Sequence, residues 1–102
     1  MSLRLVVRPE AESDIASAAQ WYEQRRPGLS LDFRSALDRT LSSILETPEL
    51  YARVYRDLRR ALLRRFPYGV FYLRRAEVII LVAVLHTSRN PKLWRTRFKR
   101  SG

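Results

Sequence analysis

The longest apolar run in the chain is Val78-Ile79-Ile80-Leu81-Val82-Ala83-Val84-Leu85, and the predicted fold is built around it. The run is far shorter than the roughly 20 residues that a membrane-spanning helix needs. Its many β-branched side chains predict a strand that is buried on both faces and lies at the centre of a sheet. Simple alternation places Ile80, Val82 and Val84 on one face, and Ile79, Leu81 and Ala83 on the other.

Extended segments on both sides of a helical region complete the predicted sheet. Arg60–Phe66 alternates with a period of two, which puts Arg on both faces and Phe66 on the face of Leu62. Tyr68–Leu73 resumes the extended pattern, and Arg74–Glu77 supplies the turn into the apolar run. A short run at Leu3–Val7 predicts an N-terminal strand. We therefore expect a mainly antiparallel sheet of about four strands.

Two helices are predicted between the N-terminal strand and the sheet. Apolar residues recur at three- and four-residue steps from Ala11 to Tyr22, and Pro9 suits the first turn of that helix. Ser30 is a candidate N-cap for the second helix, which must end by Thr47 because a proline follows. Helices joined by so short a loop form an antiparallel hairpin. Packing this hairpin on one face of the sheet gives an α+β fold.

The C-terminal segment and the composition limit what else the chain can be. Lys92–Lys99 predicts a short basic helix or tail with Leu93, Trp94 and Phe98 on one side. The length of 102 residues fits a single domain over 1–102. The chain has no Cys and one His, and no apolar leader precedes the first strand. We expect a cytoplasmic protein with no metal site, no cofactor and no membrane contact.

Charge is divided unequally along the chain. Residues 1–50 carry a net charge of −2 and residues 51–102 carry +12, and 18 of the 20 basic residues are Arg. Because the basic half also contains the predicted strands, its Arg side chains extend from a folded surface. A planar guanidinium suits bidentate contact with phosphate or carboxylate, so we expect a polyanionic partner. The alternative is a compositional bias that merely solvates one face.

His86 is the one side chain whose ordinary pKa lies near neutrality, and it ends the apolar strand. Cleavage of RNA by its own 2′-hydroxyl needs a base, a proton donor and cations on the phosphate. His86 with Arg64, Arg65 and Arg89 would be sufficient for that chemistry. The alternative is a structural His that bonds a backbone carbonyl or the turn at Asn90. No glycine elbow around a Ser and no phosphate-binding glycine loop is present.

Aromatic residues alternate with the basic ones in the second half. Rings beside Arg can stack on the bases of single-stranded RNA. A small sheet also needs large side chains in its core, and we assign Phe66, Phe71 and Tyr72 mainly to that role. Trp21-Tyr22 fits helix packing with one ring at the edge of a groove. Trp94 is the ring that we least expect to be buried.

Several segments, taken in order, resemble the RelE/ParE superfamily of type II toxin–antitoxin toxins. The segments that carry the resemblance are Pro9–Ile15, Trp21–Glu23, Arg26–Leu29, Thr47–Tyr51, Arg59–Tyr68 and Val84–Pro91. The resemblance covers nearly the whole chain and agrees with that family's α+β fold. It implies a bacterial toxin in a hetero-oligomer with a cognate antitoxin, whose flexible tail wraps the toxin and whose own domain often binds operator DNA. Because the +12 half lies beside apolar surface, we expect that tail to be acidic and apolar.

The family divides by target. RelE-like members cut mRNA on the ribosome with basic residues of the sheet, and ParE-like members poison DNA gyrase and lack that set. RelE-like chains commonly have an Arg in the strand that contains Gly69 here. We therefore favour a ParE-like toxin that acts by binding gyrase, with a ribosome-dependent nuclease using His86, Arg89 and Arg65 as the alternative. A stand-alone RNA-binding module and a non-toxic co-repressor relic are two further readings.

Candidate residues follow for each surface. Those proposed to contact the target or nucleic acid are Arg60, Arg64, Arg65, Arg89, Trp94, Arg95 and Arg97. Those proposed to contact the antitoxin are Trp21, Tyr22, Tyr68 and Tyr72.

Overall fold

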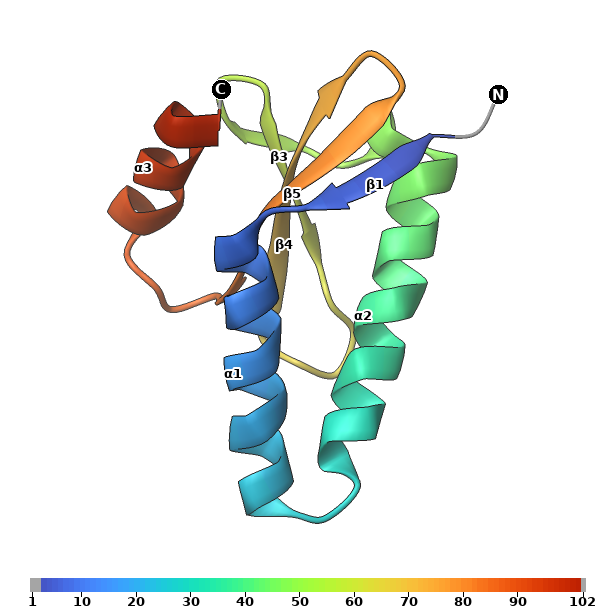
Figure 1. Cartoon of the computed structure of the whole chain (residues 1–102), viewed down its shortest axis with the longest axis vertical. Helices are drawn as coiled ribbons and strands as arrows, with labels where there is room; N and C mark the ends of the chain where they lie inside the picture. Colours follow the sequence, from blue (N-terminus) through green and yellow to red (C-terminus); the bar gives the residue numbers. More distant parts are fainter. Residues whose placement is uncertain (1–2, 102) are drawn as a thin grey trace.

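The computed structural model describes residues 3–101 and contains one sheet with helices on both of its faces (Figure 1). Its elements are β1 (Arg4–Val7), α1 (Pro9–Arg25), α2 (Leu29–Glu46), the 3₁₀ helix η1 (Pro48–Leu50), β2 (Arg53–Tyr55), β3 (Leu58–Leu62), β4 (Tyr68–Arg75), β5 (Val78–His86) and α3 (Pro91–Ser101). The strand order is β1-β5-β4-β3-β2, and only β1 runs parallel to its neighbour. The predicted α+β class and the mainly antiparallel sheet are confirmed.

The sheet has five strands rather than the predicted four or so, and the additional strand is β2. With three residues, β2 is too short to show a period of two. β5 is an interior strand, as expected for so apolar a run. The central position, however, belongs to β4, since β1 adds to the other side of β5.

The α1–α2 hairpin forms as predicted, but its turn is held differently. Gly28 is the residue before α2 and has a left-handed φ of 88°, so Ser30 is not the N-cap. The carboxylate of Glu23 accepts hydrogen bonds from the Gly28 N–H at 3.0 Å and the Ser30 hydroxyl at 2.7 Å. Glu23 therefore supplies the capping group that we had assigned to Ser30.

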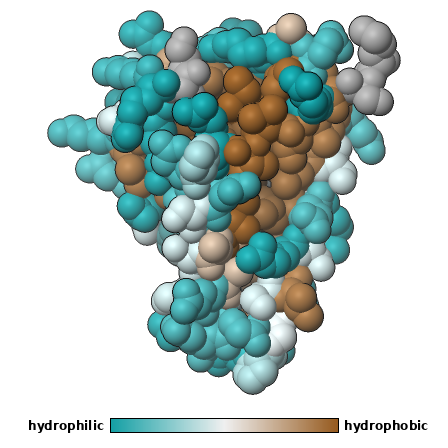
Figure 2. Space-filling view, viewed as in Figure 1, coloured by the Kyte–Doolittle hydropathy of each residue, from teal (hydrophilic) through white to brown (hydrophobic). Residues whose placement is uncertain are grey.

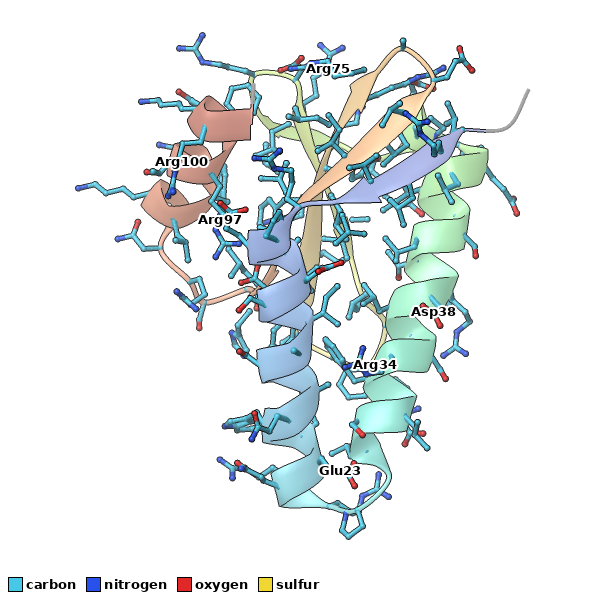
Figure 3. The ribbon with its side chains drawn as sticks, viewed as in Figure 1. Glu23, Arg34, Asp38, Arg75, Arg97 and Arg100 are labelled. Atoms are coloured by element: carbon cyan, nitrogen blue, oxygen red, sulfur yellow. The ribbon has the colours of Figure 1, made fainter. Side chains whose placement is uncertain are left out.

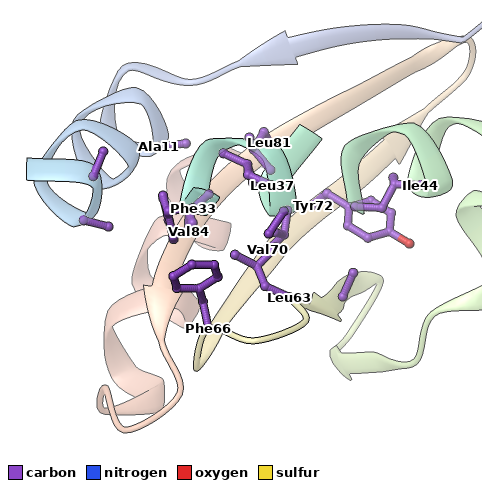
Figure 4. Close-up of a cluster of buried hydrophobic side chains, with 14 of the residues drawn as sticks. Ala11, Phe33, Leu37, Ile44, Leu63, Phe66, Val70, Tyr72, Leu81 and Val84 are labelled. Carbon is purple, nitrogen blue, oxygen red and sulfur yellow. The ribbon is translucent and has the colours of Figure 1, made fainter. Parts of the chain in front are cut away.

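The main core lies between the hairpin and the sheet (Figure 4). Phe33 and Ile44 of α2 are fully buried there with Leu81 of β5 and Tyr72 of β4. A second cluster fills the opposite face, where Trp94 and other residues of α3 cover the sheet. Both faces are thus covered, as the apolar run predicts.

A β-bulge in β5 places Ala83 and Val84 on the faces opposite to those predicted. The register between β4 and β5 shifts at Val82, which has no partner on β4. Residues up to Leu81 follow the predicted alternation, whereas Ala83 faces α3 and Val84 faces the hairpin. The prediction was wrong at these two positions because an extra residue on one strand reverses the alternation beyond it.

The strand predicted over Arg60–Phe66 ends earlier, at Leu62. Arg65 has a left-handed φ of 72°, and Phe66 turns into the main core with Leu63. Phe66 therefore lies on the hairpin side, not on the face of Leu62, which is exposed. Within residues 3–101, none of the helices is long and apolar enough to span a bilayer.

Candidate functional site

A cleft of about 650 Å³ lies between α1 and the end of β5. It brings together five of the predicted residues: Trp21, Tyr22, Tyr68, His86 and Arg89. They come from three parts of the sequence: α1, the start of β4, and the end of β5 with the turn that follows it. The fold therefore unites three antitoxin candidates with two nuclease candidates in one depression.

The aromatic wall of this cleft is built from edge-to-face contacts. The Tyr22 ring lies 5.1 Å from Trp21 and 6.0 Å from Tyr68, measured between ring centroids. Trp21 is 47% exposed, and the Arg25 guanidinium lies 4.0 Å from its ring. Burial raises the pKa of the Tyr22 and Tyr68 hydroxyls, which further favours the protonated form that donates hydrogen bonds. The wall offers apolar rings with two polar tips.

The floor of the cleft is an edge of β5 without a neighbouring strand in the described residues. β1 pairs with β5 only as far as Leu81. Beyond it, the Val84 N–H donates to the Asp14 carboxylate at 3.0 Å. Arg97 of α3 binds the same carboxylate through two contacts, at 2.5 and 3.1 Å. Asp14 and Arg97 are about one-tenth exposed, and together they fasten α1 to α3 across this edge.

Asp14 was not among the predicted site residues, and Arg97 was predicted to contact the target. The contacts of Asp14 reach 70 and 83 residues along the chain, and no local pattern indicates them. Arg97 is committed to this buried ion pair, so its guanidinium is not offered to a partner.

His86 has a structural bond on one ring nitrogen. Its Nδ1 accepts the Ser88 N–H at 3.0 Å and lies 2.8 Å from the Ser88 hydroxyl. The Tyr68 ring contacts it edge-on at 5.4 Å. An N–H donor at Nδ1 places the proton of the neutral ring on Nε2, leaving that nitrogen for proton exchange. The structural alternative thus has support, although the partner is Ser88 and not a carbonyl or the Asn90 turn.

A smaller cavity of about 60 Å³ lies on the α3 side of the same strand ends. Arg60, Gly69, His86, Arg89 and Trp94 line it. A Cβ at Gly69 would approach the Arg60 Cδ to 2.9 Å, so the Arg60 side chain lies directly across this glycine. Trp94, the ring that we least expected to be buried, is only 7% exposed, so that expectation was wrong.

Trp94 stacks on Phe71 with 5.0 Å between ring centroids. This packing places it in the second core. Its ring is therefore not available to a target.

The other candidates are spread over separate places. Arg64 lines a cleft with Tyr51 and Leu62, and Arg65 lies 3.8 Å from an oxygen of Asp32. Neither lines the two cavities that contain His86. The predicted set of His86, Arg89 and Arg65 is therefore only partly assembled.

Tyr72 is fully buried, and its hydroxyl donates to the Pro48 carbonyl at 2.6 Å. Burial raises the pKa of Tyr72 to about 12. The assignment of Tyr72 to the core is confirmed. In this conformation Tyr72 cannot contact an antitoxin, because its side chain is fully buried.

An apolar face remains open beside the hairpin. Figure 2 shows it as a brown area over β1 and between α1 and α2. The partly exposed aliphatic side chains there are Leu3, Leu5, Val7, Ile15, Leu41 and Leu45. Patches of this kind mark partner sites on soluble proteins. Residues 3–101 contain no group of three or more His, Cys or acidic side chains able to hold a metal ion.

Comparisons with known proteins give consistent results. A family model described as the ParE toxin of the type II toxin–antitoxin system parDE matches residues 5–91. Toxin ParE2 of Mycobacterium tuberculosis is 29% identical over 92 residues, which are 89% of this chain and 88% of that protein.

Two solved structures share the fold. A chain of the chromosomal ParDE system from P. aeruginosa has a TM-score of 0.73 and 14% identity, over 82% of this chain and 95% of that one. A mutant of E. coli toxin RelE in the free state has a TM-score of 0.70 and 18% identity, over 98% of both chains.

Proposed function

Because the chain belongs to the ParE toxin family of type II toxin–antitoxin systems, we propose that it stops bacterial growth by binding DNA gyrase while a cognate antitoxin holds it inactive. The mode of action is inhibition by association rather than catalysis. The proposal places the protein in the cytoplasm, where gyrase works.

The position of Gly69 carries the choice of binding over cleavage. A nuclease needs cations that grip the scissile phosphate, and RelE-like chains commonly have an Arg in this strand. Any larger residue at position 69 would bring its Cβ to 2.9 Å from Arg60. The Ser88 bond gives His86 a structural role at Nδ1, which is compatible with either mode of action.

One observation favours the alternative, a ribosome-dependent mRNA endonuclease. Arg60, His86 and Arg89 line one cavity, which gives two cations and one imidazole within a single depression. That set has one imidazole for proton transfer and two cations for the phosphate.

Induced expression without the antitoxin separates the two readings. Wild-type protein should trigger the DNA damage response and leave ribosome-bound mRNA intact. His86→Gln should preserve growth inhibition, because an amide keeps a hydrogen bond while it abolishes proton exchange. A nuclease would instead lose roughly 10²–10⁴-fold in cleavage with this variant. Arg34→Gln, an exposed substitution on α2, is the control. Growth that continues at full rate with folded wild-type protein would identify a co-repressor relic.

We propose that the antitoxin covers the open apolar face and the aromatic cleft with an acidic and apolar segment, giving a hetero-oligomer. The support is the exposed aliphatic surface on a chain of net charge +10. Binding should weaken with salt yet persist through its apolar anchors, and calorimetry over a salt series measures both parts.

Trp21→Ala tests the cleft within this surface. Removing an exposed anchor ring should cost about 2 kcal/mol, or roughly 30-fold in affinity. Leu50→Ala is the matched control, because Leu50 is 71% exposed and lies in η1, which follows the C-terminal end of α2. Equal affinities of wild type and Trp21→Ala would remove the cleft from the interface.

A further inference from the structure

The face of α3 that points to solvent carries positive charge without compensation. No acidic residue follows Glu77 in the chain. Figure 3 shows α3 with Arg97 and Arg100 at one side of the molecule, away from α2. Within residues 3–101, Arg97 is the one cation of α3 that has a carboxylate partner. The remaining cations of this helix are Lys92, Arg95, Lys99 and Arg100.

Two guanidinium groups lie over Tyr55, where the turn between β2 and β3 meets α3. The guanidinium carbons of Arg56 and Arg95 lie 5.3 and 5.2 Å from the centroid of its ring. A hydrogen bond from Arg56 lowers the pKa of the Tyr55 hydroxyl, and the charges of Arg56, Lys99 and Arg95 lower it further. The nearby carboxylate of Asp57 is engaged by Arg75 at 2.9 Å. We name Tyr55, Arg56, Arg95 and Lys99 the Tyr55 cluster.

The cations of α3 form a row that can contact more than one phosphate. Lys92, Arg95 and Lys99 recur at three- and four-residue steps, so they lie along one side of α3. At 1.5 Å per residue this row is about 10 Å long, and a strand of duplex DNA advances about three nucleotides along the duplex axis over that length. Arg donors can also contact phosphate oxygens through two bonds.

The same surface lacks what a single strand would use. Proteins bind single strands by stacking bases on exposed rings. Here Trp94 and Phe98 are buried, and guanidinium groups lie over the ring of Tyr55. The surface can therefore hold a backbone but provides no platform for bases.

We propose that the solvent face of α3 and the Tyr55 cluster form a site for the phosphate backbone of duplex DNA. The site lies on the sheet face opposite the hairpin, so it is separate from the surface proposed for the antitoxin. Such a site contacts the charged phosphates and does not distinguish base sequences. The inference goes beyond gyrase inhibition and does not depend on it.

Fluorescence anisotropy with a labelled 20-bp duplex and the full chain tests the site. Affinity should fall between about 50 and 200 mM salt, with a slope of log K against log salt near −3 for three neutralised phosphates. Arg95→Gln/Lys99→Gln should reduce the slope by about two and weaken binding by on the order of tenfold per cation. The same oligonucleotide as a single strand should bind more weakly than the duplex.

Arg34→Gln/Arg39→Gln is the matched control, since it removes the same charge from exposed positions on α2. It should leave the salt slope within about half a unit of wild type. Thermal melting verifies that both double variants are folded. Equal losses in the two variants, no duplex binding at the lowest salt, or preference for the single strand would each overturn the proposal.

Discussion

Replacing Asp14 with Asn should loosen α3 from the rest of the fold. The amide oxygen of Asn can still accept the Val84 N–H, so the edge of β5 keeps its hydrogen bond. The Arg97 guanidinium, however, would be left without its counter-charge in a site where its side chain is 13% exposed. Breaking a buried pair by removing one partner costs about 3–5 kcal/mol, a large share of the 5–15 kcal/mol that stabilises a typical domain.

A double-mutant cycle isolates the pair. Arg97→Met should cost a similar amount, because it leaves the Asp14 carboxylate buried with only a neutral donor. The double variant Asp14→Asn/Arg97→Met should lose less than about 2 kcal/mol, since removing both buried charges is often close to neutral. Urea unfolding followed by circular dichroism measures all four free energies of unfolding.

Tryptophan fluorescence shows where the loss occurs. The chain has two Trp, and Trp21→Phe leaves buried Trp94 of α3 as the reporter. In this background Asp14→Asn should shift the emission to the red and increase quenching by acrylamide before the global transition. Single-variant costs that simply add in the double variant, or that stay below about 1 kcal/mol, would refute the assigned role of the pair.

Two further predictions concern the cores. Leu81→Ala should cost on the order of 2–4 kcal/mol in chemical denaturation, because Leu81 is fully buried and its truncation leaves a cavity; a loss below about 1 kcal/mol would contradict its central place. Tyr72→Phe should cost about 1–3 kcal/mol at neutral pH by leaving the Pro48 carbonyl unpaired. Because the folded-state pKa of Tyr72 is raised from 10.0 to about 12, its stabilisation is complete below pH 10 and is lost as pH rises to about 12. Wild type should therefore lose about 2–3 kcal/mol more than Tyr72→Phe over that interval, and parallel pH curves would contradict this.

Local patterns predicted most elements, and local chemistry explains most errors. The α1–α2 hairpin was predictable because its apolar period extends over many residues, and β5 because its apolar run is long and rich in β-branched side chains. β2 was missed for lack of length. The reversal at Val84 depends on how β5 registers with β4, and no property of the β5 sequence alone specifies which residue bulges.

The candidate site was predictable as a set of residue types but not as an arrangement. The sequence identifies the aromatic and basic residues but does not show which of them are buried in the core. Trp94 and Tyr72 became core residues, since the sheet needs large rings on both faces. Arg97 became structural through a partner 83 residues away.

The charge asymmetry of the sequence has a spatial counterpart in the fold. Among residues 3–101, three of the five ion pairs join an acidic residue of the first half to a basic residue of the second: Arg65–Asp32, Arg74–Glu49 and Arg97–Asp14. In these pairs, acidic side chains neutralise basic groups near the hairpin and the ends of the sheet. Cations on the solvent side of α3 have no acidic residue in their own segment. Positive charge therefore remains concentrated on the face opposite the open apolar surface. An antitoxin on the apolar surface would leave the basic face free, so neutralisation and contact with a polyanion need not compete for the same residues.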